Sequence, residues 1–196
     1  MNLGGGYYSE DELHAAGFRH VGKNVKIHNR ASLYVVENMS IGDNVRIDDF
    51  TVIIASGSVE IGSFVEICTH CFLGGTFGIT IADFCTLAPG VKLFSASDDY
   101  SGNMLTNPTT PADLRGGTHG KVTLEKHVII GAGSIVLPGC TVGIGSSIGA
   151  LSLVKSSLAP WGIYAGIPVG RKAQRSKKVL ELETIVAQRR LDGQKP

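Results

Sequence analysis

Two adjacent carboxylates, Asp98 and Asp99, stand in a stretch of mostly small and apolar residues, LFSASDDYSGNMLTNP. A carboxylate is a weak base at its reference pKa of about 3.9, but partial burial and a neighbouring negative charge both raise that pKa. Such a pair can therefore act in general base catalysis. The alternative is that both aspartates only hydrogen-bond nearby backbone and shape a loop, as aspartate often does.

The four cysteines offer metal ligands, but their spacing favours packing. The motif CTHC, Cys68 to Cys71, has the spacing of half a zinc knuckle, whereas a structural zinc needs four ligands. Cys71, Cys85 and Cys140 recur at a position where small side chains pack inward, so we expect buried free thiols. Disulfides are not expected in a cytoplasmic chain.

Charge and composition exclude several classes of protein. The 18 basic and 17 acidic residues give a net charge of +1, without the basic surplus of a nucleic-acid-binding protein. The sequence shows neither a membrane span nor a signal peptide. Glycine, at 26 of 196 residues, is about twice as frequent as usual, and 43% of the chain is hydrophobic. We therefore expect a soluble, cytoplasmic protein with many tight turns that binds neither nucleic acid nor membrane.

A repeat dominates the sequence. The similar segments VGKNVKI, IGDNVRI, IGSFVEI and IADFCTL begin 20 residues apart at Val21, Ile41, Ile61 and Ile81. Within and beyond them an aliphatic anchor recurs every six residues, a period that fits neither a helix nor a plain strand. Each unit must therefore hold a short strand and a turn. The eighteen anchors are Val21, Ile27, Leu33, Ile41, Ile47, Ile53, Ile61, Ile67, Leu73, Ile81, Leu87, Leu93, Leu124, Ile130, Val136, Val142, Ile148 and Val154.

Three such units close a triangular coil, so the sequence predicts an all-β protein, a parallel β-helix of about six coils. The rhythm stops at residues 95–121, and a loop of that length is typically functional. We divide the chain into a helical segment at 1–20, the β-helix at 21–158 and a C-terminal segment at 159–196. Ser9, Glu12 and Gly17 predict a capped helix near the start. An amphipathic helix is expected in the tail, where it could cover an unpaired edge of a coil.

The second half of the chain, VIIGAGSIVLPGCTVGIGSSIGALSLV followed by IYAGIPVGRK, resembles the hexapeptide-repeat acyltransferases, as do the anchors. The resemblance runs from about Val21 to Lys172. The loop SASDDYSGN and the start EDELHAAGF are most similar to N-acyltransferases of nucleotide-linked amino-deoxyhexoses, nearest to the dTDP-linked 4-amino-4,6-dideoxyhexose group. The resemblance implies a left-handed coil, a homotrimer and an acyl-CoA bound in the groove between two subunits.

The resemblance also implies an acyl-CoA site in the last coils and the segment that follows. Glycine lets backbone approach a ligand closely, and the basic run from Arg171 to Lys178 could bind the CoA phosphates. Alternatively, the glycines only form turns and the basic run is a solvated face. The backbone N–H of Gly131, or of a neighbour, is the expected oxyanion donor. The residues assigned to acyl-CoA are Gly131, Ala132, Gly149, Ala150, Ser152, Gly166, Pro168, Arg171 and Lys172.

The catalytic base stays open at this point. Many members of the family carry a histidine near the start of the loop, where this chain has SASDDYSG. An amine that attacks a thioester sheds a proton as the tetrahedral intermediate forms, and an acceptor is needed. Asp98 is the first candidate, followed by His119 and Glu125, with a mechanism that lacks a dedicated base as a further alternative. Asp99 and Tyr100 are expected to bind the substrate.

The sequence thus predicts an acyl-CoA-dependent N-acyltransferase that acts on the amine of a nucleotide-linked amino-deoxy sugar in glycan biosynthesis. A sugar O-acetyltransferase is the alternative, but a hydroxyl needs stronger base assistance than an amine. The γ-class carbonic anhydrases share the fold and bind zinc through three histidines. The paired spacing of histidines on one coil, which that class shows, is absent from this chain. His70 and His127 fall on turns, where we expect surface or interface positions. No metal is predicted, and a non-catalytic scaffold is the remaining alternative.

Overall fold

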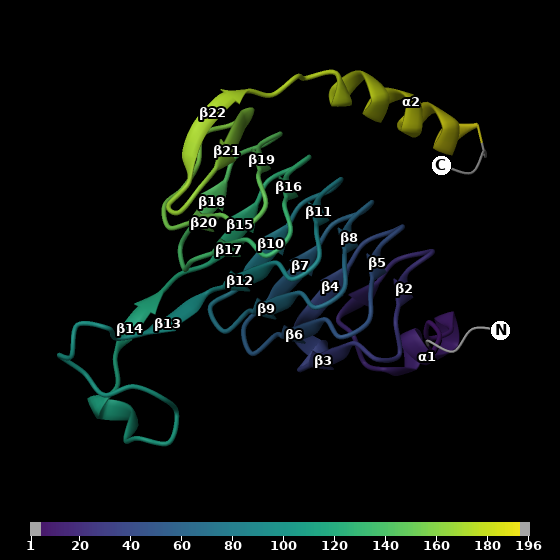
Figure 1. Ribbon diagram of the computed structural model, residues 1–196. Helices are drawn as coiled ribbons and strands as arrows, with labels where there is room; N and C mark the ends of the chain where they lie inside the picture. Colours follow the sequence, from purple (N-terminus) through teal and green to yellow (C-terminus); the bar gives the residue numbers. More distant parts are fainter. Residues whose placement is uncertain (1–4, 193–196) are drawn as a thin grey trace.

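The computed structural model describes residues 5–192, which form a triangular prism of stacked coils (Figure 1). The prism has three walls, here called sheets I, II and III, and each coil adds one strand to each sheet in turn. Sheet I contains β1 (His20–Val21), β4 (Met39–Ile41), β7 (Val59–Ile61), β10 (Ile79–Ile81), β15 (Val122–Leu124) and β18 (Thr141–Val142). Sheet II contains β2 (Lys26–Ile27), β5 (Arg46–Ile47), β8 (Glu66–Ile67), β11 (Thr86–Leu87), β16 (Ile129–Ile130), β19 (Ser147–Ile148), β21 (Gly162–Ala165) and β22 (Gly170–Gln174). Sheet III contains β3 (Ser32–Tyr34), β6 (Val52–Ile54), β9 (Phe72–Gly74), β12 (Lys92–Phe94), β17 (Ile135–Val136) and β20 (Leu153–Val154).

The aliphatic anchors fill the prism. All eighteen except Val21 and Leu33, both in the first coil, are buried. Parallel pairing stacks equivalent anchors, so that Ile41 lies beside Ile61 in sheet I. Because side chains alternate across a strand, the anchor and the residue two positions before it both point inward. This explains why small residues such as Cys85 recur before the anchors.

The prism is longer than the anchors indicated. Six complete coils are present, as predicted, and a partial seventh follows them. In it, β21 pairs with β19, and Leu158 forms a parallel bridge with Val142. The antiparallel strand β22 then pairs with β21 at the end of sheet II. The six-residue rhythm ends at Val154, so the extra turn could not be counted from the sequence.

The turns form three corners, each named here by the two sheets that it connects. At corner I–II the equivalent residues Asn44, Phe64, Phe84 and His127 all have φ between 56° and 63°, a left-handed conformation. Their side chains lie above one another. The rings of Phe64 and Phe84 stack at 4.7 Å, and those of Phe84 and His127 at 5.1 Å. The corner thus presents a continuous aromatic column.

Two α-helices lie outside the prism, α1 (Glu10–Ala15) and α2 (Val179–Leu191). The predicted capping box at α1 is confirmed: the Glu12 N–H donates to Ser9 Oγ, and the Ser9 N–H donates to Glu12 Oε2. Gly17 follows the helix at φ 86°. The predicted domain segments 1–20 and 159–196 extend into residues 1–4 and 193–196, which lie outside the described part of the chain.

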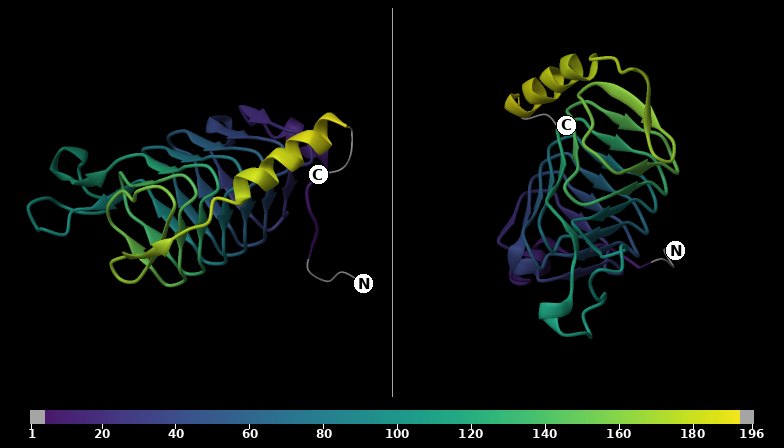
Figure 2. Two further views of the ribbon diagram at one scale, coloured as in Figure 1. Left: turned by 90° about the horizontal axis from the view of Figure 1, so that it is seen from above. Right: turned by 90° about the vertical axis from the view of Figure 1, so that its left-hand side faces the viewer.

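Helix α2 runs along corner I–II and back toward the first coils (Figure 2). Arg190 pairs with Asp43 at 2.8 Å, while Glu183 accepts a hydrogen bond from Lys126 and lies 2.7 Å from His127 Nε2. We had expected this helix to cover an unpaired edge of a coil. Instead it lies along the side of the prism, because its polar groups pair with those of the corner. His127 is therefore buried, with 6% of its surface exposed, which corrects the expectation of a surface position.

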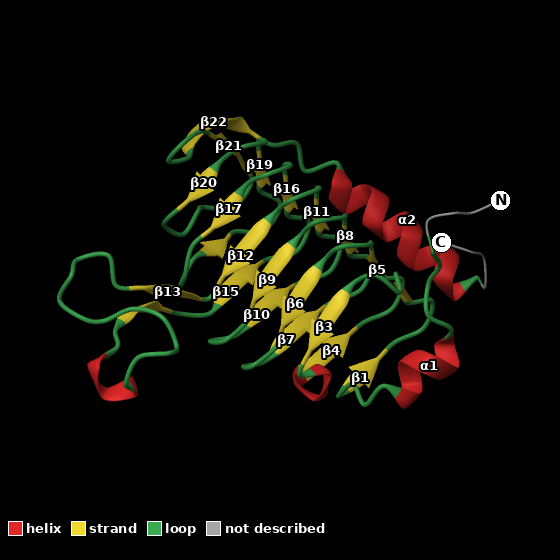
Figure 3. Ribbon diagram, turned by 60° about the horizontal axis from the view of Figure 1, so that its bottom comes forward, coloured by secondary structure: helices red, strands yellow, loops and turns green. Residues whose placement is uncertain are grey.

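The interruption in the rhythm forms a hairpin at corner III–I, between β12 and β15. Its two strands, β13 (Ala96–Asp98) and β14 (Gly117–His119), pair antiparallel, and the intervening segment contains the short 3₁₀ helix η2 (Ala112–Leu114). A second 3₁₀ helix, η1 (Val36–Asn38), lies at the same corner near the start of the prism. The hairpin projects well beyond the prism, on the side away from α2 (Figure 3).

The outer faces of the sheets differ in polarity. Sheet III presents mainly apolar residues outward, namely Val52, Ile54, Phe72, Phe94, Ile135 and Leu153, together with Tyr34 and the polar Ser32 and Lys92. Sheet I presents Ser40, Glu60, Thr80, Thr123 and Thr141. Sheet III thus carries an apolar outer face, which we call face III. Within residues 5–192, no helix is both long and apolar enough to cross a membrane.

Candidate functional site

The base of the hairpin is held by Ser95, which is fully buried. Its hydroxyl donates to Gly74 O at 2.7 Å and accepts from the Phe77 N–H at 2.9 Å. The two strands approach closely at Gly117, where a Cβ atom would lie 2.1 Å from Ser97 O. Only glycine fits there without a shift of the backbone. The hairpin therefore leaves the prism from a fixed base.

A cleft of about 820 Å³ lies between the hairpin and the prism. Its walls come from sheet III, from corner III–I and from both hairpin strands. The lining residues that matter below are Phe72, Phe77, Asp98, Arg115 and His119. The volume falls within the range of roughly 300–1,000 Å³ typical of small-molecule sites.

The structure brings two of the three candidate bases, Asp98 and His119, to this cleft. They lie on the paired strands β13 and β14, where Asp98 is opposite Gly117 and His119 is opposite Ala96. The imidazole of His119 stacks on the ring of Phe77 with centroids 4.3 Å apart. Asp98 Oδ1 accepts a long hydrogen bond of 3.5 Å from the Asn107 N–H. Both side chains line the cleft, so either can reach a substrate bound there.

Asp99, in contrast, holds the tip of the hairpin. Its carboxylate accepts hydrogen bonds from the hydroxyl and N–H of Ser101 and from the Met104 N–H, all within 3.0 Å. These bonds, that from the Ser101 hydroxyl first, lower the pKa of Asp99 to about 2. For Asp99 the loop-shaping alternative therefore holds. Tyr100 is 93% exposed and, like Asp99, is not among the residues lining the cleft.

Glu125 lies elsewhere. It follows β15 at corner I–II, whereas the cleft lies at corner III–I. Its Oε2 accepts a hydrogen bond of 2.6 Å from the Ile144 N–H of the next coil. The structure thus gives Glu125 a coil-stacking contact and does not bring it to Asp98 and His119.

The residues assigned to acyl-CoA in the last coils form one column at corner II–III. A Cβ on Gly131 would lie 2.4 Å from Ala150 N, and Gly149 packs in turn against Ala165. These glycines are therefore required by the stacking of coils. The Gly131 N–H already donates to Ile148 O at 2.8 Å, so it is not a free oxyanion donor. Our expectation for that N–H was wrong, because the coil above uses it.

Neighbouring positions in the column divide into buried and accessible groups. Ser152 is buried, and its hydroxyl donates to Ala150 O and accepts from the Gly166 N–H at 3.1 Å, so it ties the sixth coil to the seventh. Ala150 and Pro168 are exposed, and Ala132 is partly exposed. The accessible surface of the column therefore consists of small, apolar residues.

The basic run after the column has two parts. Arg171 and Lys172 lie on β22 and are exposed. Arg175 is instead used by the fold, because its Nη1 donates to His127 O, Gly145 O and Ser146 O. Arg171 Nη2 donates to Gln174 Oε1 on the same strand, so Arg171 and Lys172 are both accessible to a ligand but Arg171 already has a partner.

The buried cysteines match their prediction. Cys71, Cys85 and Cys140 are buried free thiols, and burial raises the pKa of Cys71 to about 11 and that of Cys85 to about 12. Such thiols stay protonated and pack as small apolar groups. Cys68, at corner II–III, is partly exposed and also free.

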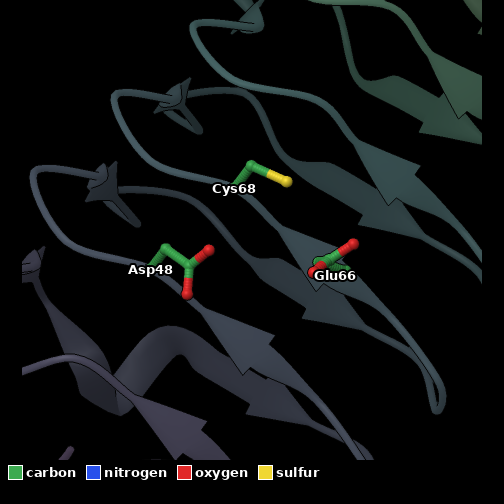
Figure 4. Close-up of side chains that lie close together, drawn as sticks. All are labelled: Asp48, Glu66 and Cys68. Carbon is green, nitrogen blue, oxygen red and sulfur yellow. The ribbon is translucent and has the colours of Figure 1, made fainter.

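Cys68 belongs to a small polar cluster with Asp48 and Glu66 (Figure 4). Among the described residues, this is the group of three whose ligand atoms lie within 4.8 Å of one another, as a metal would need. Arg46, however, bonds Asp48 at 2.7 Å and lies 3.6 Å from Glu66. Burial and the two carboxylates raise the pKa of the Cys68 thiol, which favours the neutral form over a thiolate ligand. The ion pairs of Arg46 with Asp48 and Glu66 therefore account for the closeness of these acidic side chains.

The three histidines relevant to a carbonic-anhydrase-like site lie apart. His70 lies at corner II–III beside Phe50, His119 on the hairpin at corner III–I, and His127 at corner I–II. A shared metal site between them within one chain is excluded by this placement.

Sequence reasoning missed two residues of the cleft, Phe77 and Arg115. Phe77 lies three residues after β9 ends, in a turn whose residues follow no repeating pattern. Arg115 had a signal, because it is the single Lys or Arg between residues 95 and 120.

No family model matches the chain. It is 42% identical over 180 residues, 91% of this chain and 94% of the relative, to the dTDP-4-amino-4,6-dideoxy-D-glucose acyltransferase of Escherichia coli. A solved structure of AntD, an N-acyltransferase from Bacillus cereus in complex with dTDP and 3-hydroxybutyryl-CoA, is 44% identical. It superimposes with a TM-score of 0.90 over 94% of this chain and 97% of that one.

A more distant structure shares the fold. The hexapeptide-repeat acetyltransferase VCA0836 from Vibrio cholerae is 20% identical, with a TM-score of 0.56 over 86% of this chain and 82% of that one. One family accounts for the stacked coils, the hairpin cleft and the extent of the likeness to the Escherichia coli enzyme. The chain belongs to the left-handed β-helix acyltransferases, in the group of the dTDP-4-amino-4,6-dideoxyglucose acyltransferases.

Proposed function

We propose that this protein transfers an acyl group from acyl-CoA to the amine of a dTDP-linked amino-deoxy sugar. The observation that carries the proposal is the cleft in which Asp98 and His119 converge on one space large enough for a sugar nucleotide. The relatives support it, since the Escherichia coli enzyme acts on a dTDP-linked amino sugar and AntD binds dTDP and an acyl-CoA.

In the proposed reaction, the sugar amine enters the cleft and attacks the thioester carbonyl. Asp98 orients the amine and accepts its proton as the carbon–nitrogen bond forms. The carbon–sulfur bond then breaks, and protonated Asp98 returns the proton to the departing thiolate, so that CoA leaves as its thiol. Asp98 is preferred to His119 because its carboxylate carries one long hydrogen bond, whereas the imidazole is held against Phe77. His119 remains the second candidate for the base.

Acyl-CoA is placed along the small, apolar column at corner II–III, with its phosphates near Arg171 and Lys172. The N–H of Ala132 is a better oxyanion donor than that of Gly131, which is already bonded to Ile148 O. Ala132 is partly exposed beside Ala150, where the pantetheine arm would lie.

We further propose that the active unit is a homotrimer. The cleft and the acyl-CoA column lie at opposite edges of sheet III, so a single chain does not bring the two substrates together. If face III packs against a neighbouring copy, the column of one chain meets the cleft of the next, and a ring closes. We place the reaction in the cytoplasm, because four free cysteines are typical of a reducing compartment.

The test is a mass-spectrometric assay of the full chain with a panel of acyl-CoAs and dTDP-linked sugars. Acylated product is expected from dTDP-4-amino-4,6-dideoxyglucose, and none from a dTDP sugar with a hydroxyl in place of the amine. Transfer to the hydroxyl sugar alone would replace the proposal with O-acylation. Absence of transfer to either sugar would remove it.

A further inference from the structure

Arg115 occupies an unusual position in the hairpin. It is the single Lys or Arg between residues 95 and 120, and it lines the cleft that also contains Asp98. Its backbone is held firmly: Arg115 bridges Leu105, and the next residue, Gly116, donates to Leu105 O and accepts from the Asp99 N–H. The charge is therefore positioned by the fold and not by a free loop end.

The guanidinium of Arg115 lacks a partner. Among the described residues, its ε nitrogen is the buried side-chain nitrogen or oxygen atom that makes no hydrogen bond. None of the ion pairs within residues 5–192 includes Arg115, and the Asp99 carboxylate at the hairpin tip is engaged by Ser101 and Met104. A buried donor without an acceptor is costly, and natural proteins rarely retain one unless a ligand or water completes it.

We infer that Arg115 binds the diphosphate of the nucleotide-linked substrate. This inference rests on the proposed function and assigns a specific residue to substrate recognition. The planar fork of a guanidinium matches two phosphate oxygens, and such charge-assisted bonds are about twice as strong as neutral ones. A diphosphate offers a guanidinium more acceptor oxygens and more negative charge than a carboxylate does.

The cleft then holds two groups of opposite charge, Arg115 and Asp98. Arg115 meets the diphosphate, and Asp98 meets the amine of the sugar. A sugar nucleotide bearing an amine carries the complementary groups, an anionic diphosphate and a basic amine. The pair thus fixes the direction in which the substrate enters and rejects nucleotide sugars bound the other way round.

The experiment compares dTDP with thymidine, which lacks both phosphates, by calorimetry on the full chain. Arg115→Gln removes the charge and keeps a polar, uncharged side chain that can still donate a hydrogen bond. It should weaken dTDP binding by about 10- to 100-fold, the worth of one charge-assisted hydrogen bond or slightly more. Thymidine binding, measured by competition, should change by less than about twofold. Arg115→Lys should retain part of the difference, because a single ammonium replaces the fork.

The matched control is Arg189→Gln, an exposed arginine on α2, which should leave both affinities unchanged. Acyl-CoA binding and the melting temperature report whether Arg115→Gln remains folded. In turnover, the same variant should raise KM for the sugar nucleotide and leave KM for acyl-CoA unchanged.

Two negative results separate this inference from the proposed function. If wild type binds dTDP and acylates the amino sugar, while Arg115→Gln loses dTDP and thymidine affinity equally or not at all, the assignment of Arg115 is wrong and the function stands. If wild type neither binds dTDP nor acylates the sugar, both are overturned.

Discussion

At the residue scale, Asp98 and Asp99 show how neighbours of one type acquire different environments. The two side chains leave an extended strand on opposite sides, so that one lines the cleft and the other turns into the hairpin tip. Asp99, at a pKa of about 2, is ionised throughout the working range and serves the backbone.

Asp98→Asn should lower turnover by about 10²–10⁴, because the amide keeps the shape of the side chain but cannot accept the proton. Acyl-CoA affinity should not change, since the acyl-CoA column lies at another corner. Steady-state kinetics and calorimetry measure the two quantities. If Asp98→Asn keeps near wild-type turnover while His119→Ala loses turnover, the base is His119 and not Asp98.

The matched variant Asp99→Asn should act through the hairpin. It removes the charge that the Ser101 and Met104 groups stabilise. We expect a raised KM for the sugar nucleotide with a smaller loss of turnover than in Asp98→Asn.

Replacing Arg171 and Lys172 with alanine should weaken acyl-CoA binding by about 1.5–3 kcal/mol for each charge-assisted hydrogen bond lost. Both side chains are exposed on β22, beyond the acyl-CoA column. Calorimetry with CoA and with dephospho-CoA measures the effect, and wild type should bind dephospho-CoA less well. Equal affinity of wild type for the two would show that β22 is a solvated strand.

At the element scale, the hairpin and α2 are attached to the prism in different ways. The hairpin continues from β12 and is fixed by backbone pairing and by buried Ser95. Helix α2 has no buried residue and is held by its polar groups, above all Glu183 against Lys126 and His127. The position of α2 therefore depends on charge, and that of the hairpin does not.

Glu183→Gln should destabilise the docked helix by about 1 kcal/mol at pH 7, a modest value because the site is partly exposed to solvent. Lys126 first, then His127, holds the pKa of Glu183 below its usual 4.5. A lowered folded pKa gives stability that is present above pH 4.5 and lost as the pH falls through the lower value. The melting difference between wild type and the variant should thus shrink as the pH falls from 7 through the lowered pKa of Glu183.

The control for this prediction is Glu181→Gln, on the same helix but exposed. It should leave the melting temperature unchanged at both pH values. A difference between wild type and Glu183→Gln that persists undiminished at low pH would contradict an electrostatic attachment of α2.

At the scale of the whole molecule, the outer surfaces of the prism differ in polarity and in what packs against them. Sheet I is polar outside and faces solvent, corner I–II carries α2, and face III is apolar between the cleft and the acyl-CoA column. An exposed apolar face of this extent marks an interaction surface. Face III separates the cleft from the acyl-CoA column within one chain. In our proposal, activity therefore requires a ring of copies that brings the column of one chain to the cleft of the next.

Light scattering should therefore give a mass of about three chains of 20.6 kDa each. Ile54→Asp, on face III, should shift the mass toward one chain and abolish acyl transfer, because a buried unpaired charge opposes association. The matched variant Thr123→Asp, on the outer face of sheet I, should remain trimeric and active. A stable wild-type monomer with full activity would exclude a site shared between copies.

The coil and the type of reaction could be derived from the sequence alone. An aliphatic anchor every six residues leaves one way to bury those side chains, and each unit repeats the same local decision, so the six coils and the core could be derived without tertiary information. The capping box at Ser9 and the buried thiols were predictable for the same reason, because their causes lie within a few residues.

The tertiary structure alone decided which corner each residue occupies and what covers it. His127 is buried because Glu183, 56 residues later, lies against it, and Gly131 N–H is engaged by a carbonyl of the following coil. Glu125 and Asp98 are both near the interruption in sequence but lie at different corners, because a coil turns through a third of the prism at each unit. A local pattern fixes the inward direction of a side chain, whereas its neighbours along the prism axis come from residues about 20 positions away or more. The unpartnered guanidinium of Arg115 also depends on tertiary structure, because Arg115 lies in the cleft between the hairpin and the prism.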